Sequence, residues 1–80
     1  MPKEAVLKRF DLLLNNNVRL RLHNVKVVKD SQRHIIHLIG NPVKISLARD
    51  RSKKVYASSD NLGLFGLVKG LPEFMIRLLS

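Results

Sequence analysis

The alternation of apolar and polar residues in the middle of the chain is typical of short β-strands with one buried face. Polar or glycine-containing stretches separate the alternating segments, as expected for tight turns. Four such segments follow one another: residues 18–28, 33–39, 43–48 and 54–58. Short turns join antiparallel neighbours, so these segments predict a four-stranded antiparallel sheet.

Both ends of the chain instead show apolar residues at helical spacing. In residues 3–14, apolar side chains recur three and four positions apart, and the three asparagines that follow favour a turn after a helix. Toward the other end we expect a short helix over 61–69 and another over 72–79, with Pro72 in its first turn. A single helix with a kink at Pro72 is the alternative.

The segment 18–28 changes phase in its middle. Its inward-facing apolar residues are even-numbered in the first half and odd-numbered in the second: Leu20, Leu22, Val25 and Val27. Either a β-bulge near residues 23–24 or a two-residue hairpin turn there would place all four on one side. We favour the bulge, because the hairpin would oppose Arg21 to Lys26 and would lack the glycine that such turns prefer.

Together these elements predict a single α+β domain over residues 1–80. The sheet would be packed on one face by the N-terminal helix and the C-terminal helices. A chain of this length buries a modest fraction of its surface, so we expect self-association as a further source of buried area.

Three features bear on location. The chain contains no cysteine, which excludes disulfides and thiolate metal sites and fits a reducing compartment. Residues 1–10 lack the apolar core of a secretory signal, and the apolar stretch 62–79 contains charges and a proline that a membrane span would avoid. We therefore expect a cytoplasmic protein that does not enter the membrane.

The charge balance indicates a polyanionic partner. Fifteen lysines and arginines against six acidic residues give a formal net charge of +9, which favours encounters with nucleic acids. The polar face of the predicted sheet and the loop after the third strand gather cations and one tyrosine. Our first hypothesis is a non-enzymatic nucleic-acid-binding protein that uses Arg19, Arg21, Lys26, Lys44, Arg49, Arg51, Lys53, Lys54 and Tyr56. The sequence does not distinguish DNA from RNA.

A protein-interaction or dimerisation module is the alternative hypothesis. The C-terminal segment is more apolar than one sheet face requires, and exposed apolar surface usually marks a contact. A homo-oligomer or a protein partner would dock on Phe65, Val68, Phe74, Met75 and Leu78.

A third and weaker hypothesis is a small ribonuclease that works without a metal, with histidine as acid and base beside arginine. Its candidates are His23, His34 and His37, but no motif brings them together, so we expect no enzyme. His34 and His37 would lie on opposite faces of a strand, and the ligand clusters that metals need are missing. Phosphate-loop motifs are also missing, so we expect neither a metal nor a cofactor.

Overall fold

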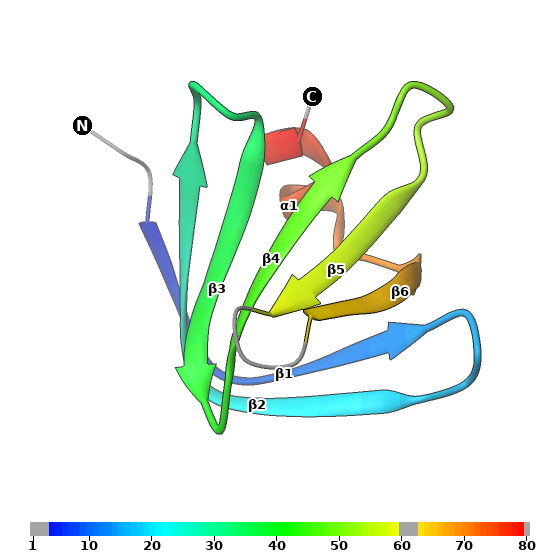
Figure 1. Cartoon of the computed structure of the whole chain (residues 1–80). Helices are drawn as coiled ribbons and strands as arrows, with labels where there is room; N and C mark the ends of the chain where they lie inside the picture. The colour runs from blue at the N-terminus through cyan, green and yellow to red at the C-terminus, as the bar shows by residue number, and fades with distance from the viewer. Residues whose placement is uncertain (1–3, 60–62, 80) are drawn as a thin grey trace.

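The computed structural model describes residues 4–59 and 63–79, which form a closed antiparallel β-barrel of six strands followed by one short helix (Figure 1). Each strand pairs with the next one along the chain, and β1 also pairs with β6, which closes the barrel. The elements are β1 (Glu4–Leu14), β2 (Arg19–Asp30), β3 (Ile35–Asn41), β4 (Lys44–Arg49), β5 (Val55–Ser59), β6 (Gly63–Gly70) and α1 (Glu73–Leu79).

The hydrophobic core lies inside the barrel, where side chains from β1 to β5 meet side chains from α1. The α+β prediction, a four-stranded sheet packed on one face by helices, is therefore wrong. The sheet curls until its own inner surface encloses the core, so it needs no layer of helices. Fully buried members of this core include Leu12, Leu22, Leu38, Ile45 and Leu47.

Residues 4–14 form strand β1, so the predicted N-terminal helix is wrong. The prediction rested on the helical spacing of Val6, Phe10 and Leu13, with Leu7 and Leu14 beside them. In the structure Phe10 is in the core and Leu7, three positions earlier, packs against it. From Phe10 to Leu14 the inward side chains alternate regularly, as in a strand. Val6, which the helical stripe would have buried, is 74% exposed.

The phase change in the second strand is a bulge, as predicted, and the hairpin alternative is wrong. β2 is one continuous strand, and its register against β3 shifts in the middle. His23 pairs with Asn41 and Lys26 with Ile39, so three steps along β2 match two along β3. Asn24, inside this shift, has a φ of 52°, a left-handed conformation that asparagine tolerates better than most residues.

The bulge in β2 coincides with the phase change in β1. Leu7 pairs with Val25 and Phe10 pairs with Leu22, so the inward residues of both strands skip three positions at the same place. Both strands bend sharply there, at the lower left of Figure 1. We call this bend the β1–β2 corner. It allows one long hairpin to form two sides of the barrel.

Gly40 of β3 lies against this corner. A Cβ atom at this position would be 3.0 Å from the carbonyl oxygen of His23 and 3.0 Å from Cγ2 of Val25. The extra residue in β2 therefore brings its backbone so close to β3 that only a residue without a side chain fits without a shift.

The three central strands, β3, β4 and β5, lie within two residues of their predicted positions. In β4 the predicted alternation is confirmed, with Ile45 and Leu47 fully buried. The turn before β3 comes slightly later than predicted, because Asp30 organises it. Its Oδ1 accepts hydrogen bonds from the backbone N–H groups of Gln32, at 3.1 Å, and Arg33, at 3.2 Å, as in an Asx turn.

Residues 63–70 form strand β6, so the helix predicted over 61–69 is wrong where the structure describes it; residues 60–62 lie outside the described part. β6 pairs with β5 and with β1, and its register is irregular on both sides. Gly66 has a φ of 134°, which glycine adopts far more readily than other residues. Gly66 thus suits the irregular backbone of this closing strand.

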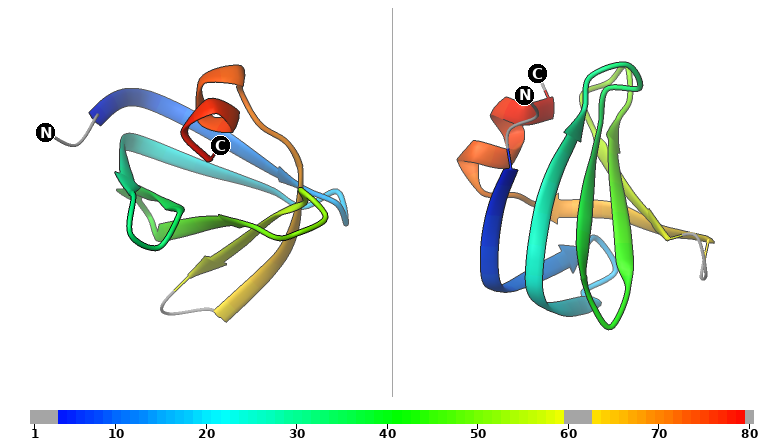
Figure 2. Two further views of the ribbon diagram at one scale, coloured as in Figure 1. Left: turned by 90° about the horizontal axis from the view of Figure 1, so that it is seen from above. Right: turned by 90° about the vertical axis from the view of Figure 1, so that its left-hand side faces the viewer.

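The last predicted helix is confirmed as α1. The carbonyl oxygen of Pro72 accepts hydrogen bonds from the N–H groups of Met75, at 3.1 Å, and Ile76, at 3.2 Å, which begin the helix. α1 lies across one end of the barrel (Figure 2) and inserts Met75 and Leu79 into the core.

Candidate functional site

The loop between β4 and β5 is a compact turn organised by Asp50. Its Oδ1 accepts a hydrogen bond from the Ser52 hydroxyl at 2.8 Å and another from the Lys54 N–H at 2.9 Å. These bonds, led by the one from Ser52, hold the pKa of the Asp50 carboxyl below its usual range. Lys53 has a φ of 68° and donates its N–H to the Asp50 carbonyl oxygen at 3.1 Å. The loop is therefore fixed by its own polar groups.

Four cations lie in or beside this loop, and Nε of Arg49 donates a hydrogen bond to the carbonyl oxygen of Lys53 at 3.5 Å. Arg51, Lys53 and Lys54 are exposed, and Arg49 is half-buried at the end of β4. These four are the loop cations predicted to bind phosphate. The Asp50 carboxylate accepts hydrogen bonds inside the turn, and the positive charge of Lys54 also lowers its pKa, so Asp50 offsets part of the charge of the loop.

A pocket of about 290 Å³ opens beside this loop, between β5, β6 and α1. We call it the cationic pocket. Four of its lining residues are cationic, Arg49, Lys53, Lys54 and Lys69, and we call these four the rim. Its remaining lining is aliphatic apart from the Gly70 backbone, and consists of Val55, Leu67, Val68, Leu71, Ile76 and Leu79. No acidic side chain is among these lining residues. The nearest acidic residue of α1, Glu73, lies 3.8 Å from Arg77, measured from Oε1 to Nε.

Lys69 is the residue of this pocket that sequence reasoning missed. The segment around it was assigned to a helix, which separated it from the loop cations. In the structure β6 pairs with β5, with Leu67 opposite Tyr56, and this pairing brings Lys69 to the same pocket as Lys53 and Lys54. The only available signal was the glycine spacing of residues 63–70, which fits an irregular strand as well as a helix.

Tyr56 lies next to the pocket on the outer surface of the barrel. It is half-buried and stands in a row between Ala48 of β4 and Leu67 of β6. Of the aromatic side chains described, Phe10 is in the core and Phe74 is on α1. Tyr56 is thus an aromatic residue on the outer surface two positions after Lys54, and its role in stacking stays a prediction.

The predicted pair Arg19 and Arg21 lies elsewhere, on the outer face of the β1–β2 hairpin. Arg21 is opposite Asp11 of β1 and forms a two-pronged ion pair with it: Nε to Oδ1 is 2.9 Å and the second nitrogen to Oδ2 is 3.3 Å. The hydrogen bond from Arg21, together with the charges of Arg21, Arg9 and Arg19, holds the pKa of the Asp11 carboxyl below its usual range. The charge of Arg21 is therefore largely offset.

Arg9 is a second cation that sequence reasoning missed, because it was placed on a helix. In β1 it lies directly opposite His23 of β2, and both are exposed. Arg9, Arg19 and Arg21 surround Asp11, so this part of the hairpin keeps a net positive charge.

Lys26 and Lys44 belong to a third region. Register places Lys26 between Val6 of β1 and Ile39 of β3, and Ile39 next to Lys44 of β4. Both lysines are exposed, and the two apolar neighbours are exposed as well. The predicted single basic face is thus divided by the closure of the barrel. The β4–β5 loop lies at the upper right of Figure 1 and the tip of the β1–β2 hairpin at the lower right.

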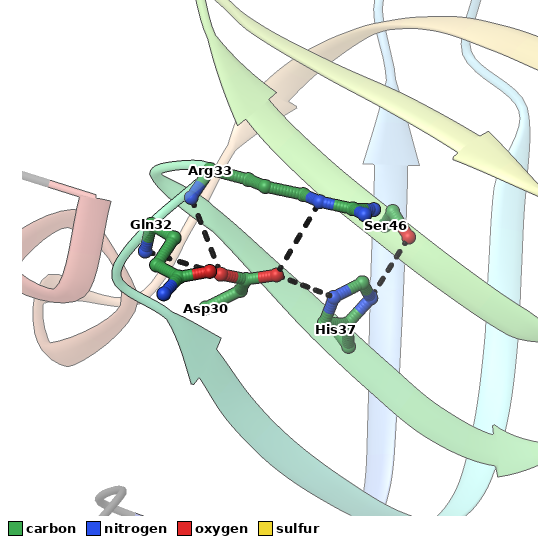
Figure 3. Close-up of polar contacts among 5 residues, drawn as sticks. All are labelled: Asp30, Gln32, Arg33, His37 and Ser46. Atoms are coloured by element: carbon green, nitrogen blue, oxygen red, sulfur yellow. Dashed lines mark hydrogen bonds and ion pairs between the residues drawn. The ribbon is translucent and has the colours of Figure 1, made fainter.

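A Ser–His–Asp arrangement lies on the outer surface of β2, β3 and β4 (Figure 3). The Ser46 hydroxyl is 3.1 Å from Nδ1 of His37, and Nε2 of His37 is 3.9 Å from Oδ2 of Asp30. A catalytic triad requires a carboxylate that hydrogen-bonds the imidazole and fixes its tautomer. At 3.9 Å the Asp30 carboxylate makes no such hydrogen bond to His37. Ser46 lies directly opposite His37 in a regular ladder and lines neither the cationic pocket nor the smaller pocket at Leu14 and Asn15.

The three histidines do not form one site. His23 is at the β1–β2 corner, His34 is in the turn before β3 with a φ of 56°, and His37 faces Ser46. Among the described residues there is no group of three His, Cys, Asp or Glu side chains that could hold a metal ion. The arrangement therefore offers neither a metal centre nor a histidine pair for acid–base catalysis.

The residues predicted for a protein interface have different environments. Met75 is fully buried, Leu78 and Val68 are partly buried against the core, and Phe74 is 38% exposed. The side chain of Phe65 lies outside the described residues. Much of the apolar C-terminal segment is thus buried where it closes the end of the barrel.

The fold and the pocket define the chain as a small basic β-barrel protein with a cationic pocket at one end. Comparison with protein-family models, with curated proteins and with solved structures found no match. Helix α1 spans only seven residues, and the described part of the chain contains no helix that could cross a membrane.

Proposed function

We propose that this protein is a non-enzymatic nucleic-acid-binding protein whose main contact is the phosphate backbone. The observation that carries the proposal is the gathering of Arg49, Arg51, Lys53, Lys54 and Lys69 at one end of the barrel. Four of the five line one pocket that contains no acidic side chain. Basic clusters of this kind supply most of the sequence-independent affinity for nucleic acids.

The surface also offers a continuation of this cluster toward the β1–β2 hairpin. Gly70 pairs with Leu13, and Leu13 pairs with Arg19. Two strand spacings therefore separate the end of β6 from Arg19, which is about 10 Å. A nucleic-acid backbone that leaves the pocket past Lys69 would meet Arg19 and Arg9 next.

The dimensions of the molecule limit the length of the bound segment. Its longest axis is 33 Å, and one strand of a duplex advances about 3.4 Å per nucleotide. One copy can therefore contact about ten nucleotides of a strand. Tyr56 beside the loop supplies a single ring for stacking, so the expected affinity comes mainly from phosphates and carries little sequence specificity.

The test is a salt titration of binding to a short duplex, with a variant and a control of equal charge. In the variant, Arg51, Lys53 and Lys54 are each changed to Gln. In the control, the exposed residues Lys8, Arg33 and Arg77, none of which belongs to the predicted contact set, are changed to Gln. Each phosphate contact adds about 0.9 to the slope of log affinity against log salt, so the variant should lose about 2.7 from that slope and the control much less. Equal losses would show that net charge alone drives binding and would refute a defined site.

A second variant tests the region around Asp11. Because Asp11 offsets the charge of Arg21, we expect Arg21→Ala to change the affinity little. Asp11→Asn should increase it, since this change releases a cation beside Arg9 and Arg19. Weaker binding by Asp11→Asn would exclude this hairpin from the contact surface.

Self-association through α1 stays a prediction. The exposed aromatic residue of α1 is Phe74. Sedimentation velocity over a range of concentrations, with Phe74→Asp as the variant, tests whether the protein self-associates through it. A wild-type protein that is monomeric at all concentrations would refute it.

A further inference from the structure

The cationic pocket combines two surfaces that a phosphate backbone would not use together. Its lining contains the four cations of the rim and, from β5 to α1, a set of aliphatic residues that we call the floor. Val55, Leu67, Val68 and Leu71 are only partly buried, and Ile76 is 38% exposed. A ligand that touches only the rim would leave this apolar area in water, so the pocket is better matched by a ligand with an apolar part and an anionic end.

The size of the pocket sets the size of the apolar part. Its volume is about 290 Å³, roughly twice that of a 150 Å³ cavity that holds one benzene molecule. The occupant should therefore have about a dozen non-hydrogen atoms. Its single anionic group would lie at the rim, since Lys69 of β6 and Lys53 and Lys54 of the loop line the same pocket.

The lining also favours an aliphatic chain over a nucleobase. Base recognition relies on aromatic side chains for stacking and on polar groups that pair with the edges of the base. None of the side chains that line this pocket is aromatic, and its polar side chains are all cations at the rim. The edges of a base would lose their hydrogen bonds to water on entering such a pocket, whereas a hydrocarbon chain has none to lose.

We propose that the cationic pocket binds a small amphipathic anion, a medium-length aliphatic chain that ends in a single carboxylate or phosphate group. The chain lies on Val68, Leu71 and Ile76, and the anionic group is held by Lys69, Lys53 and Lys54. Because the ligand touches both β6 and α1, its binding also stabilises the docking of α1 on the barrel. This inference does not depend on nucleic-acid binding.

The first experiment compares sodium octanoate with its fragments in isothermal titration, below the concentration at which octanoate forms micelles. Acetate carries the anionic group alone, octanol carries the chain alone, and hexanoate shortens the chain by two methylenes. Each buried methylene is worth about a fourfold gain in affinity, so octanoate should bind about 15-fold more tightly than hexanoate. Acetate and octanol should each bind far more weakly than octanoate. Octyl phosphate in place of octanoate shows which anionic group is preferred.

The second experiment locates the binding with variants that have matched controls. Ile76→Ser should weaken octanoate about tenfold, because it removes part of the floor. Phe74→Ser is its control, since Phe74 is on the same helix and is equally exposed at 38% but does not line the pocket. Lys69→Gln should weaken octanoate about fivefold and leave octanol unchanged, with Lys44→Gln as the control. Circular dichroism confirms that each variant is folded.

Amide shifts in a two-dimensional NMR spectrum complete the test. Octanoate should move the signals of Lys69, Leu71 and Ile76 and leave those of the β1–β2 corner in place. Equal effects of the paired variants, or equal affinities for octanoate and hexanoate, would overturn the proposal. Failure of octanoate and octyl phosphate to bind would also overturn it. In that case, binding of an acidic peptide with a leucine side chain would reassign the pocket to a protein partner.

Discussion

At the scale of single residues, two carboxylates decide where the positive charge of this protein is available. Asp50 is bonded to Ser52 and to the backbone of Lys54, so it shapes a loop and leaves the cations around it exposed. Asp11 binds the guanidinium of Arg21 and offsets its charge. The sequence places cations beside both carboxylates, but only the structure distinguishes the loop that stays positive from the arginine that is paired.

Both carboxylates predict a loss of stability in acid. The pKa values of Asp11 and Asp50 lie below the ordinary value of 3.8 when the protein is folded. The unfolded chain therefore takes up their protons at a higher pH than the folded one. Their contribution to the free energy of unfolding is complete above pH 3.8 and is lost as the pH falls through the lowered pKa values.

The measurement is urea-induced unfolding at intervals between pH 6 and about pH 2. The wild type should lose stability below pH 3.8. Asp11→Asn and Asp50→Asn should each be less stable than the wild type at pH 6 and should show a flatter decline in acid. If both Asp11→Asn and Asp50→Asn lose stability in acid as steeply as the wild type, these two carboxylates are not the cause of the loss.

At the scale of elements, the β1–β2 corner explains both the success and the failure of prediction from sequence. In β2 the polar residues 23–24 interrupt an otherwise clear alternation, so a bulge was predictable. In β1 the same skip of three positions falls between Leu7 and Phe10, where it has the spacing of a helix. The two skips are directly opposite each other, and this pairing, which a local pattern does not contain, identifies β1 as a strand.

The close packing at the β1–β2 corner also predicts that position 40 does not tolerate a side chain. A methyl group there would contact the His23 carbonyl oxygen and Val25 Cγ2 at 3.0 Å. Gly40→Ala should therefore lower the free energy of unfolding by about 1–3 kcal/mol, the usual cost of overpacking. Gly70→Ala is the control, because a Cβ atom at Gly70 would meet no atom within 4 Å. Urea unfolding measures the free energy of unfolding of both variants. Equal values would show that the β1–β2 corner can shift to accommodate a methyl group without loss of stability.

At the scale of the whole molecule, the barrel joins residues that are far apart in the sequence. The loop cations were predicted as a group because they are adjacent along the chain. Lys69 could not be added to them, since its position depends on the pairing of β6 with β5. The predicted face of Arg19, Lys26 and Lys44 assumed a flat sheet, and closure of the barrel distributes these residues around its surface.

The helix α1 completes the core of this barrel, and substitution of Met75 measures how much α1 contributes to the free energy of unfolding. Met75 is fully buried between the strands, whereas its neighbour Phe74 is 38% exposed. Met75→Ala should lower the free energy of unfolding by about 2–5 kcal/mol, the usual cost of removing a buried large side chain. Phe74→Ala should cost much less. Thermal unfolding followed by circular dichroism measures both, and a small effect of Met75→Ala would show that α1 is not part of the cooperative unit.

The junction between β1 and β6 has a consequence for how the barrel opens. β1 pairs with β2 along nearly its whole length, but in the described residues its register pairs with β6 are Leu13 with Gly70 and Leu14 with Val68. The N–H of Asn15 adds one hydrogen bond to the carbonyl oxygen of Leu67. Amide protons at this junction should therefore exchange with deuterated water before those of the central strands. Each opening would expose two strand edges next to the cationic pocket, where a second chain could add its own strand.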